Sequence, residues 1–197
     1  MASTTMRAAS DAVDGRRYTT AAIWLHWLTA PLIAGQFAIA WAMMSLSETD
    51  PRGGAYFAFH KSLGITIWLL IAVRLVWRFT HPAPRHGPRL PRPYALASDV
   101  VQWALYLVFF CMPISGYVMS AMSSHGVQFW GIPLPSIPRV PAIQKLAATG
   151  HNLGQWAAYL IIVLHVGGAA WHALVRRDGA IERMLPAQVN ADPTRPI

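Results

Sequence analysis

Residues 149–175 read TGHNLGQWAAYLIIVLHVGGAAWHALV and contain no Asp, Glu, Lys or Arg. A helix that crosses a lipid bilayer needs about 20 consecutive apolar residues, so this stretch is long enough to span one. Three further stretches share its length and apolar character; they cover residues 22–44, 56–77 and 100–122. The sequence therefore predicts an all-α integral membrane protein, a four-transmembrane-helix bundle.

The overall composition agrees with a membrane protein. Hydrophobic residues make up 54% of the 197-residue chain and charged residues only 12%, whereas soluble domains carry about 25% charged residues. The net charge of +8 is explained by basic residues placed between apolar stretches, and nucleic-acid binding is not expected. The single cysteine, Cys111, excludes an intramolecular disulfide and a Cys-x-x-Cys-His covalent haem site.

The distribution of Lys and Arg predicts the orientation. Twelve of the sixteen lie in the N-terminal tail, in the stretch Arg74–Arg92 and from Arg176 onward; the other four are Arg52, Lys61, Arg139 and Lys145. Basic residues accumulate on the cytoplasmic side, so we expect a multi-pass protein of a bacterial inner membrane with both termini cytoplasmic. Residues 1–20 and 179–197 are then cytoplasmic tails around a membrane domain of residues 21–178.

Four histidines lie inside the predicted spans, where ionisable residues are rare and functional by default. His26 is near the cytoplasmic start of the first span, and His60 and His151 are near the outer starts of the second and fourth. His165 follows His151 by fourteen residues, about 21 Å deeper and on the same helix face. The histidines thus fall at two depths, with two at each depth.

This arrangement predicts two metal-binding pairs. We expect His26 to meet His165 on the inner side and His60 to meet His151 on the outer side. Neutral imidazole is a good ligand for haem iron, and helix bundles carry cofactors between facing helices. The sequence therefore predicts two haem b groups, each with two axial histidines.

Basic residues and glycines near these histidines have two interpretations. Arg74 and Arg78 are expected partners of the inner haem propionates, but positive-inside anchoring explains them equally. Lys61 is a candidate contact for the outer propionates or for an anionic donor. The glycines either leave room for a flat macrocycle or allow close helix packing; they are Gly64, Gly150, Gly154, Gly167 and Gly168.

At these residues the sequence resembles a known family, the bacterial cytochromes b561, which are related to the cytochrome b subunits of nickel–iron hydrogenases. The resemblance runs from about Arg17 to Pro186. The motifs that carry it are Trp24-Leu25-His26-Trp27-Leu28, Phe59-His60-Lys61-Ser62-Leu63-Gly64, Arg74-Leu75-Val76-Trp77-Arg78, Ser115-Gly116-Tyr117 and the His151–His165 pair. It implies four helices, two b haems on the same four histidines, and electron exchange with quinone.

The resemblance also bears on the remaining histidines. His172 matches a further histidine of the family and is a candidate for binding or protonating a quinone, although an interfacial histidine can equally have no special role. His81, His86 and His125 lie in the predicted linkers and are expected to be solvent-exposed.

The leading hypothesis is a small redox protein that passes electrons from an outer-side donor to a ubiquinone-type quinone. For stand-alone family members of this length, the resemblance implies superoxide-to-ubiquinone oxidoreductase activity, and the cationic outer residues would attract superoxide. A second hypothesis is a haem-bearing membrane anchor for a separate soluble dehydrogenase or hydrogenase. A third is a histidine-lined metal or proton transporter, although the predicted spans lack the Asp and Glu that such relays commonly use. The sequence does not decide the oligomeric state.

Overall fold

The computed structural model describes residues 17–84 and 90–186. Its four long helices are α2 (Thr20–Met44), α3 (Gly53–Thr80), α4 (Arg92–Ala121) and α5 (Pro141–Trp171). A π-helical turn, η1 (His172–Arg176), continues α5, and a short 3₁₀ helix, η2 (Glu182–Met184), follows. Two short strands, β1 (Gln128–Phe129) and β2 (Ile132–Pro133), pair antiparallel between α4 and α5.

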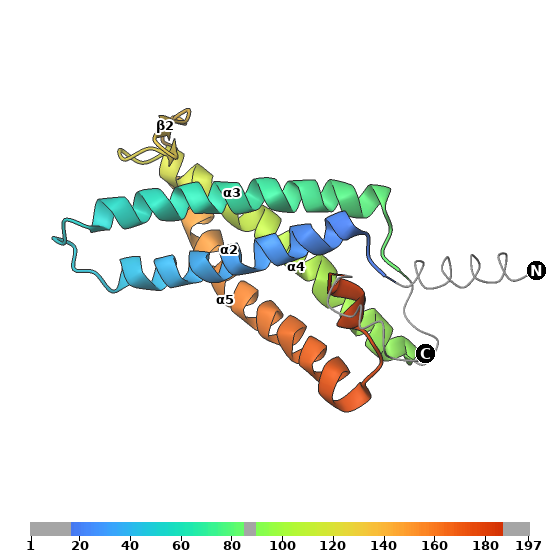
Figure 1. Ribbon diagram of the computed structural model, residues 1–197. Helices are drawn as coiled ribbons and strands as arrows, with labels where there is room; N and C mark the ends of the chain where they lie inside the picture. The colour runs from blue at the N-terminus through green and yellow to red at the C-terminus, as the bar shows by residue number, and fades with distance from the viewer. Residues whose placement is uncertain (1–16, 85–89, 187–197) are drawn as a thin grey trace, which may run out of the picture.

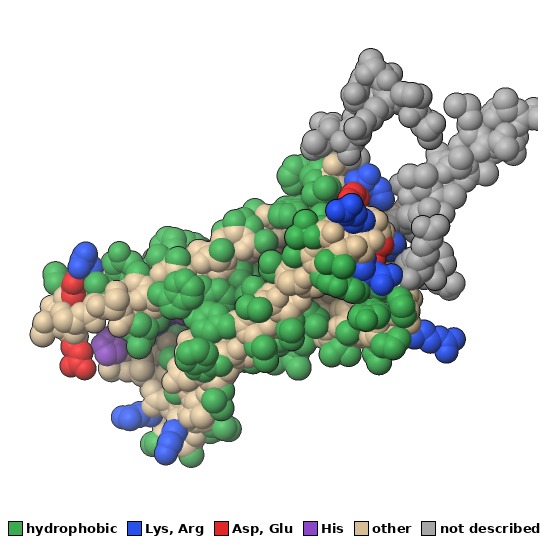
Figure 2. All heavy atoms as spheres, turned by 90° about the horizontal axis from the view of Figure 1, so that it is seen from below, with side chains coloured by type: hydrophobic (Ala, Val, Ile, Leu, Met, Phe, Trp, Pro, Cys, Tyr) green, Lys and Arg blue, Asp and Glu red, His purple; other side chains and the backbone are tan. Residues whose placement is uncertain are grey.

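All four long helices have the length and hydropathy of membrane spans. Figure 2 shows a broad hydrophobic surface along the molecule, with the Lys, Arg, Asp and Glu side chains visible in that view gathered toward its ends. This is the distribution that a lipid bilayer requires, because charged groups are costly in its hydrocarbon core. The prediction of an all-α, four-span membrane protein is confirmed.

The helices are longer than the apolar stretches that predicted them. The third begins at Arg92 rather than at residue 100, and the fourth begins at Pro141 rather than at residue 149. Proline is favoured in the first helical turn, where its missing N–H costs nothing, and both helices have one there. Apolar windows mark the membrane-crossing part of a helix, whereas caps and prolines mark its ends.

Helix α3 lies at the centre of the packing. It lies along α2 on one side and packs on α4 on the other, and α5 packs on α4 (Figure 1). The buried core comes from Leu63, Ile67 and Ile71 of α3. The residues packed against it are Leu32, Ile33, Tyr106, Phe109 and Phe110. In Figure 1, α5 crosses α2 obliquely.

The β1–β2 hairpin caps one end of the bundle. Trp130 and Gly131 form its turn with positive φ values of 49° and 89°, the signature of the type I′ turn that matches strand twist. The Trp130 backbone N–H donates to Ser62 Oγ at 3.0 Å, and its indole N–H donates to Thr66 Oγ1 at 3.1 Å. The linker therefore folds back onto α3.

At the opposite end, the segment after α5 returns across the start of α2. Arg177 adopts a left-handed conformation with φ of 51° and reverses the chain. The Trp27 indole N–H then donates to the Met184 carbonyl at 2.6 Å, and the Tyr18 N–H donates to the Arg183 carbonyl at 3.3 Å. The first and last described residues thus share one end of the bundle (Figure 1). Residues 1–16 and 187–197 of the predicted tails lie outside the described residues.

Candidate functional site

The pair His60 and His151 joins α3 to α5 near the hairpin-capped end. Their ring centroids are 6.3 Å apart and the ring planes are inclined by 80°. His151 Nδ1 lies 3.0 Å from the backbone carbonyl oxygen of Met112. A carbonyl can only accept, so Nδ1 carries the proton and Nε2 keeps its lone pair. We call these two histidines the outer pair, after the side on which the positive-inside rule places them.

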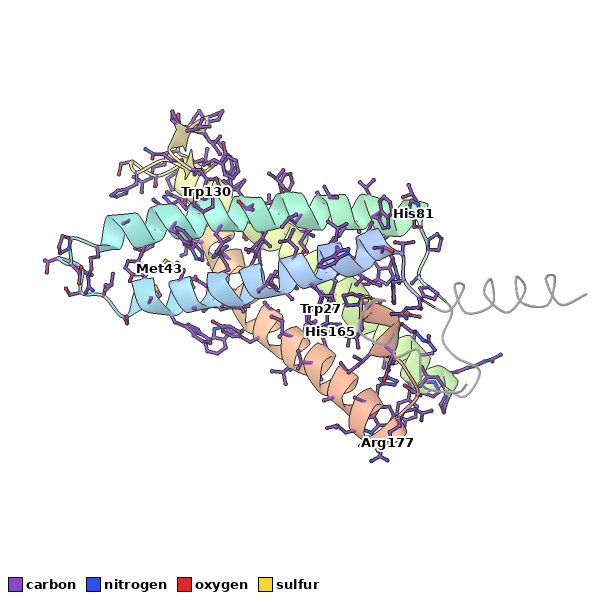
Figure 3. The ribbon with its side chains drawn as sticks, in the orientation of Figure 1. Trp27, Met43, His81, Trp130, His165 and Arg177 are labelled. Carbon is purple, nitrogen blue, oxygen red and sulfur yellow. The ribbon has the colours of Figure 1, made fainter. Side chains whose placement is uncertain are left out.

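The pair His26 and His165 joins α2 to α5 toward the other end, and we call it the inner pair. Its ring centroids are 6.2 Å apart with planes inclined by 62°. The Trp27 ring stands edge-on to His26 with centroids 5.2 Å apart. Figure 3 shows His165 on α5 beside Trp27, on the side of α5 that faces α2. Helix α5 therefore contributes one histidine to each pair.

The spacing of both pairs fits a metal ion held between two imidazoles. A metal–imidazole bond is roughly 2 Å long, so a shared ion places the two ring centroids roughly 6 Å apart. The two separations, 6.2 and 6.3 Å, agree with this value. Among residues 17–84 and 90–186, no group of three or more His, Cys, Asp or Glu is placed to bind a metal. Two protein ligands suit haem, because the porphyrin supplies the other four nitrogens.

Glycine determines how close the helices come around the outer pair. A Cβ added at Gly116 would lie 3.0 Å from His151 Cε1 and 3.2 Å from its Nδ1. Any residue larger than glycine would therefore displace the His151 ring. A Cβ at Gly154 would collide with the Met112 side chain. For Gly150, as for Gly167 and Gly168, an added Cβ would meet nothing within 4 Å. Gly116 and Gly154 therefore allow close helix packing, while the other three face open space.

The expected propionate partners lie at different distances from the histidines. Arg74 Nη2 is 3.4 Å from His26 Nδ1, and its guanidinium stands 5.8 Å from the Tyr106 ring centroid. Arg78 is one turn further along α3 and half-buried. At the other end, Lys61 Nζ donates to the Gly126 carbonyl at 2.8 Å. Arg74 is thus the cation in contact with the inner pair.

His172 belongs to a separate cluster where α5 ends. Its Nδ1 lies 2.8 Å from Asp178 Oδ2, and Arg176 Nε donates to the same oxygen at 3.0 Å. The Arg176 guanidinium also stands 5.2 Å from the Trp171 ring centroid and 5.9 Å from that of Tyr94. Because Asp178 engages Nδ1, Nε2 is the nitrogen of His172 left for a ligand.

The charge of Asp178 is maintained by its neighbours. Burial raises the pKa of this carboxyl, but the hydrogen bonds from His172 and Arg176 outweigh that effect and hold the pKa below its ordinary value.

The linker histidines have a different environment: His81 and His125 are exposed, as expected. His86 lies outside the described residues.

Two contributors to these pairs were not found from the sequence. The Met112 carbonyl is a backbone group, so no residue-type search could find it. Gln36 on α2 contacts the His60 ring and its carbonyl. Glutamine is neutral, so Gln36 is not among the ionisable residues that indicated the site. A single amide in an otherwise apolar span nevertheless indicates a buried polar contact.

Four apolar helices and two cross-helix histidine pairs define the chain as a multi-pass helical membrane protein of the kind that binds cofactors between its helices. A family model described as prokaryotic cytochrome b561 matches residues 17–187. The chain belongs to the prokaryotic cytochrome b561 family. It is therefore a bacterial membrane protein of electron transfer that binds b-type haem.

Individual relatives agree with this assignment. The chain is 29% identical over 171 residues to cytochrome b561 homolog 2 of Escherichia coli K12, covering 86% of this chain and 91% of that protein. It is 29% identical over 180 residues to the probable superoxide oxidase CybB of Yersinia pestis, with 87% and 97% covered. It is 26% identical over 173 residues to cytochrome b562 of Cereibacter sphaeroides, with 85% and 94% covered.

Proposed function

We propose that the protein transfers electrons between a donor on the outer side of the membrane and a ubiquinone-type quinone in the bilayer. The proposal rests on the inner pair and the outer pair of histidines, in which the ring centroids are 6.2 and 6.3 Å apart respectively. The inner pair and the outer pair would each hold one haem b. When bound, haem would supply one-electron redox chemistry at its iron, and ligation by two histidines would favour electron transfer over oxygen chemistry.

The chain's own residues orient the ligands and screen them from water. The Met112 carbonyl fixes the tautomer of His151. The hairpin, held on α3 through Trp130, covers the bundle at the outer end. At the inner end, the segment after α5 is held by the indole of Trp27. Because the hairpin and the segment after α5 cover the two ends of the bundle, the protein is suited to exchange electrons with a small diffusible donor and with a quinone that reaches it through lipid.

Superoxide is the donor that we propose. One relative bears the name probable superoxide oxidase, and the outer end carries cationic residues that attract anions. Arg52 contributes least, because it forms an ion pair with Asp50 at 2.8 Å. Hydrogen bonds from Arg52 hold the pKa of Asp50 at about 2, so this carboxylate stays charged. The attraction then rests on Lys61, Arg139 and Lys145.

The quinone would bind beside His172. Its Nε2 is left for a ligand while Asp178 holds Nδ1, which suits a residue that exchanges a proton with a reduced quinone. Tyr94 and Trp171 supply aromatic surface next to it: their rings stack with centroids 5.2 Å apart. His172→Gln should slow quinone reduction and leave the haem spectra unchanged; unchanged quinone kinetics would remove this site.

The overall function is tested with purified protein in detergent, an enzymatic source of superoxide and a soluble ubiquinone analogue. We expect superoxide-dependent quinone reduction that slows as salt is raised, and that is slower in both Lys61→Gln and Lys145→Gln than in wild type. A haem-loaded protein that shows no such activity, but co-purifies with a soluble dehydrogenase, would instead be an anchoring subunit. Family membership favours electron transfer over a histidine-lined transporter.

A further inference from the structure

Four aromatic rings meet between α2 and α5, with Tyr159 of α5 at their centre. The Tyr159 ring centroid lies 4.8 Å from that of Phe37 and 6.1 Å from that of Trp41, both on α2. It also lies 5.7 Å from the centroid of Trp156, one turn earlier on α5. The Trp41 indole N–H donates to the Tyr159 hydroxyl oxygen at 2.7 Å. We call these four residues the aromatic clasp.

The aromatic clasp joins two helices whose close packing is with other partners. Helix α2 packs closely on α3, and α5 packs closely on α4. A second ring contact between α2 and α5 is the inner pair, His26 with His165. Because the backbones of α2 and α5 pack elsewhere, side chains must close the seam between these two helices.

On α2, the aromatic clasp lies at the level of the outer pair. Phe37 directly follows Gln36, whose amide nitrogen is 3.3 Å from His60 Nε2, and Trp41 is one turn further out. Phe37 also follows His26 by eleven residues. Eleven steps of about 100° return to within about 20° of the starting direction. Phe37 therefore projects from the same face of α2 as a proposed haem ligand.

On α5, the aromatic clasp lies on the flank of the helix face that carries the ligands. Tyr159 follows His151 by eight residues and precedes His165 by six, which turns it by about 80° and about 120° away from them. Its ring is half-buried, whereas Trp41 and Trp156 are 63% and 66% exposed. The exposed rings lie toward lipid, so the clasp covers the seam where lipid would otherwise reach the outer pair.

A cover at this level bears on where quinone is reduced. A quinone moves within the bilayer and can approach any redox group that lipid reaches. Its reduction to quinol consumes two electrons and two protons, so the level at which it is reduced decides the side of the membrane that supplies the protons. The quinone site proposed beside His172 lies at the opposite, cytoplasmic end.

We propose that the aromatic clasp shuts the outer haem off from quinone in the bilayer and thereby confines quinone reduction to the inner end. The inference rests on the proposed function, in which the outer pair and the inner pair each hold a haem. Tyr159 is then a residue that determines specificity without touching the substrate. No residue of the clasp is a proposed ligand, so its loss should leave the redox-difference spectrum of the outer haem unchanged.

The first test measures quinone access to the outer haem in a His26→Ala background, where that haem should be the one that remains. The protein is placed in lipid nanodiscs and reduced, a ubiquinone analogue is added, and reoxidation of the haem is followed by absorbance. Tyr159→Ala removes the ring contacts and the hydrogen bond and should speed reoxidation about 10-fold or more. The matched control is Leu160→Ala, which removes a side chain that is 61% exposed and should react as the parent does.

The second test separates opening of the seam from damage to the bundle. Ferricyanide is a hydrophilic oxidant that does not enter lipid, so it should reoxidise the outer haem of Tyr159→Ala at the rate of the parent. A distorted bundle would change the redox-difference spectrum and react faster with both oxidants, and that result overturns the proposal. Transfer of the outer haem to a scavenging protein should be faster in Tyr159→Ala than in Leu160→Ala; equal transfer would show that the seam is still closed.

The third test concerns the hydrogen bond of the clasp. Tyr159→Phe and Trp41→Phe each keep an aromatic ring and remove this same bond, so each should speed quinone reoxidation about 3-fold. The double variant should be no faster than either single variant, because the two substitutions remove one shared interaction. Effects that multiply would contradict a role for the bond between these two residues.

The His26→Ala background separates the two levels of inference. If it retains both haems or loses both, the ligand assignment itself fails. If it retains the outer haem alone, while Tyr159→Ala and Leu160→Ala react alike with the quinone analogue, the ligand assignment stands and the role of the clasp is refuted.

Discussion

Replacing Gly116 by alanine perturbs the outer pair without touching a histidine. The added Cβ would lie 3.0 Å from His151 Cε1, whereas ordinary contact begins at 3.4 Å, so the ring must withdraw by about 0.4 Å. That movement strains the 3.0 Å hydrogen bond between His151 Nδ1 and the Met112 carbonyl. Losing a bond of this kind costs about 1 kcal/mol, and a misoriented ligand adds to it. We expect the outer haem to bind about 10-fold more weakly, which is about 1.4 kcal/mol.

The assay measures haem release from the outer site alone. In a His26→Ala background, the outer haem should be the one that remains, and its transfer to a haem scavenger can be followed by absorbance. Gly54→Ala is the matched control, because a Cβ at Gly54 meets nothing within 4 Å. Gly116→Ala that releases haem at the rate of the control would refute the reasoning, since the predicted contact would then have no consequence.

Three further outcomes follow from the structure. Arg74→Gln should lower the midpoint potential of the inner haem and leave the outer one unchanged in a redox titration, because a nearby cation disfavours ferric iron. Trp27→Phe removes the indole donor to the Met184 carbonyl; it should expose the segment after α5 to limited proteolysis, whereas equal protease resistance would show that this bond does not hold the segment. Asp178 has a pKa below its ordinary value, so its stabilising contacts are complete above the unfolded-state pKa of about 3.9 and are lost as the pH falls through the lower folded value. The melting temperatures of wild type and Asp178→Asn should therefore differ at pH 5 and converge below about pH 4; a gap that persists in acid would contradict this.

The sequence predicted the elements whose physical cause is local. Spans follow from long apolar runs, and the two depths follow from the fourteen residues between His151 and His165 at a fixed rise per residue. The structure places His165 beside His26 and His151 beside His60. Their service as haem ligands remains a proposal.

The sequence did not predict what depends on tertiary contact. The hairpin follows from a Trp130-Gly131 turn whose left-handed backbone is compensated by hydrogen bonds to α3. The return of the C-terminal segment depends on the Trp27 indole, which donates to the Met184 carbonyl. Gln36 and the Met112 carbonyl are selected by geometry between helices, which a spacing argument along one helix cannot supply.

The most direct measurement of the central claim is the haem-to-protein ratio with redox-difference spectra for wild type and four single variants. Wild type should carry two b haems per chain. His26→Ala and His165→Ala should each lose the same spectral component, and His60→Ala and His151→Ala should each lose the other. One haem per chain, or components lost in any other grouping, would contradict the assignment of the two pairs.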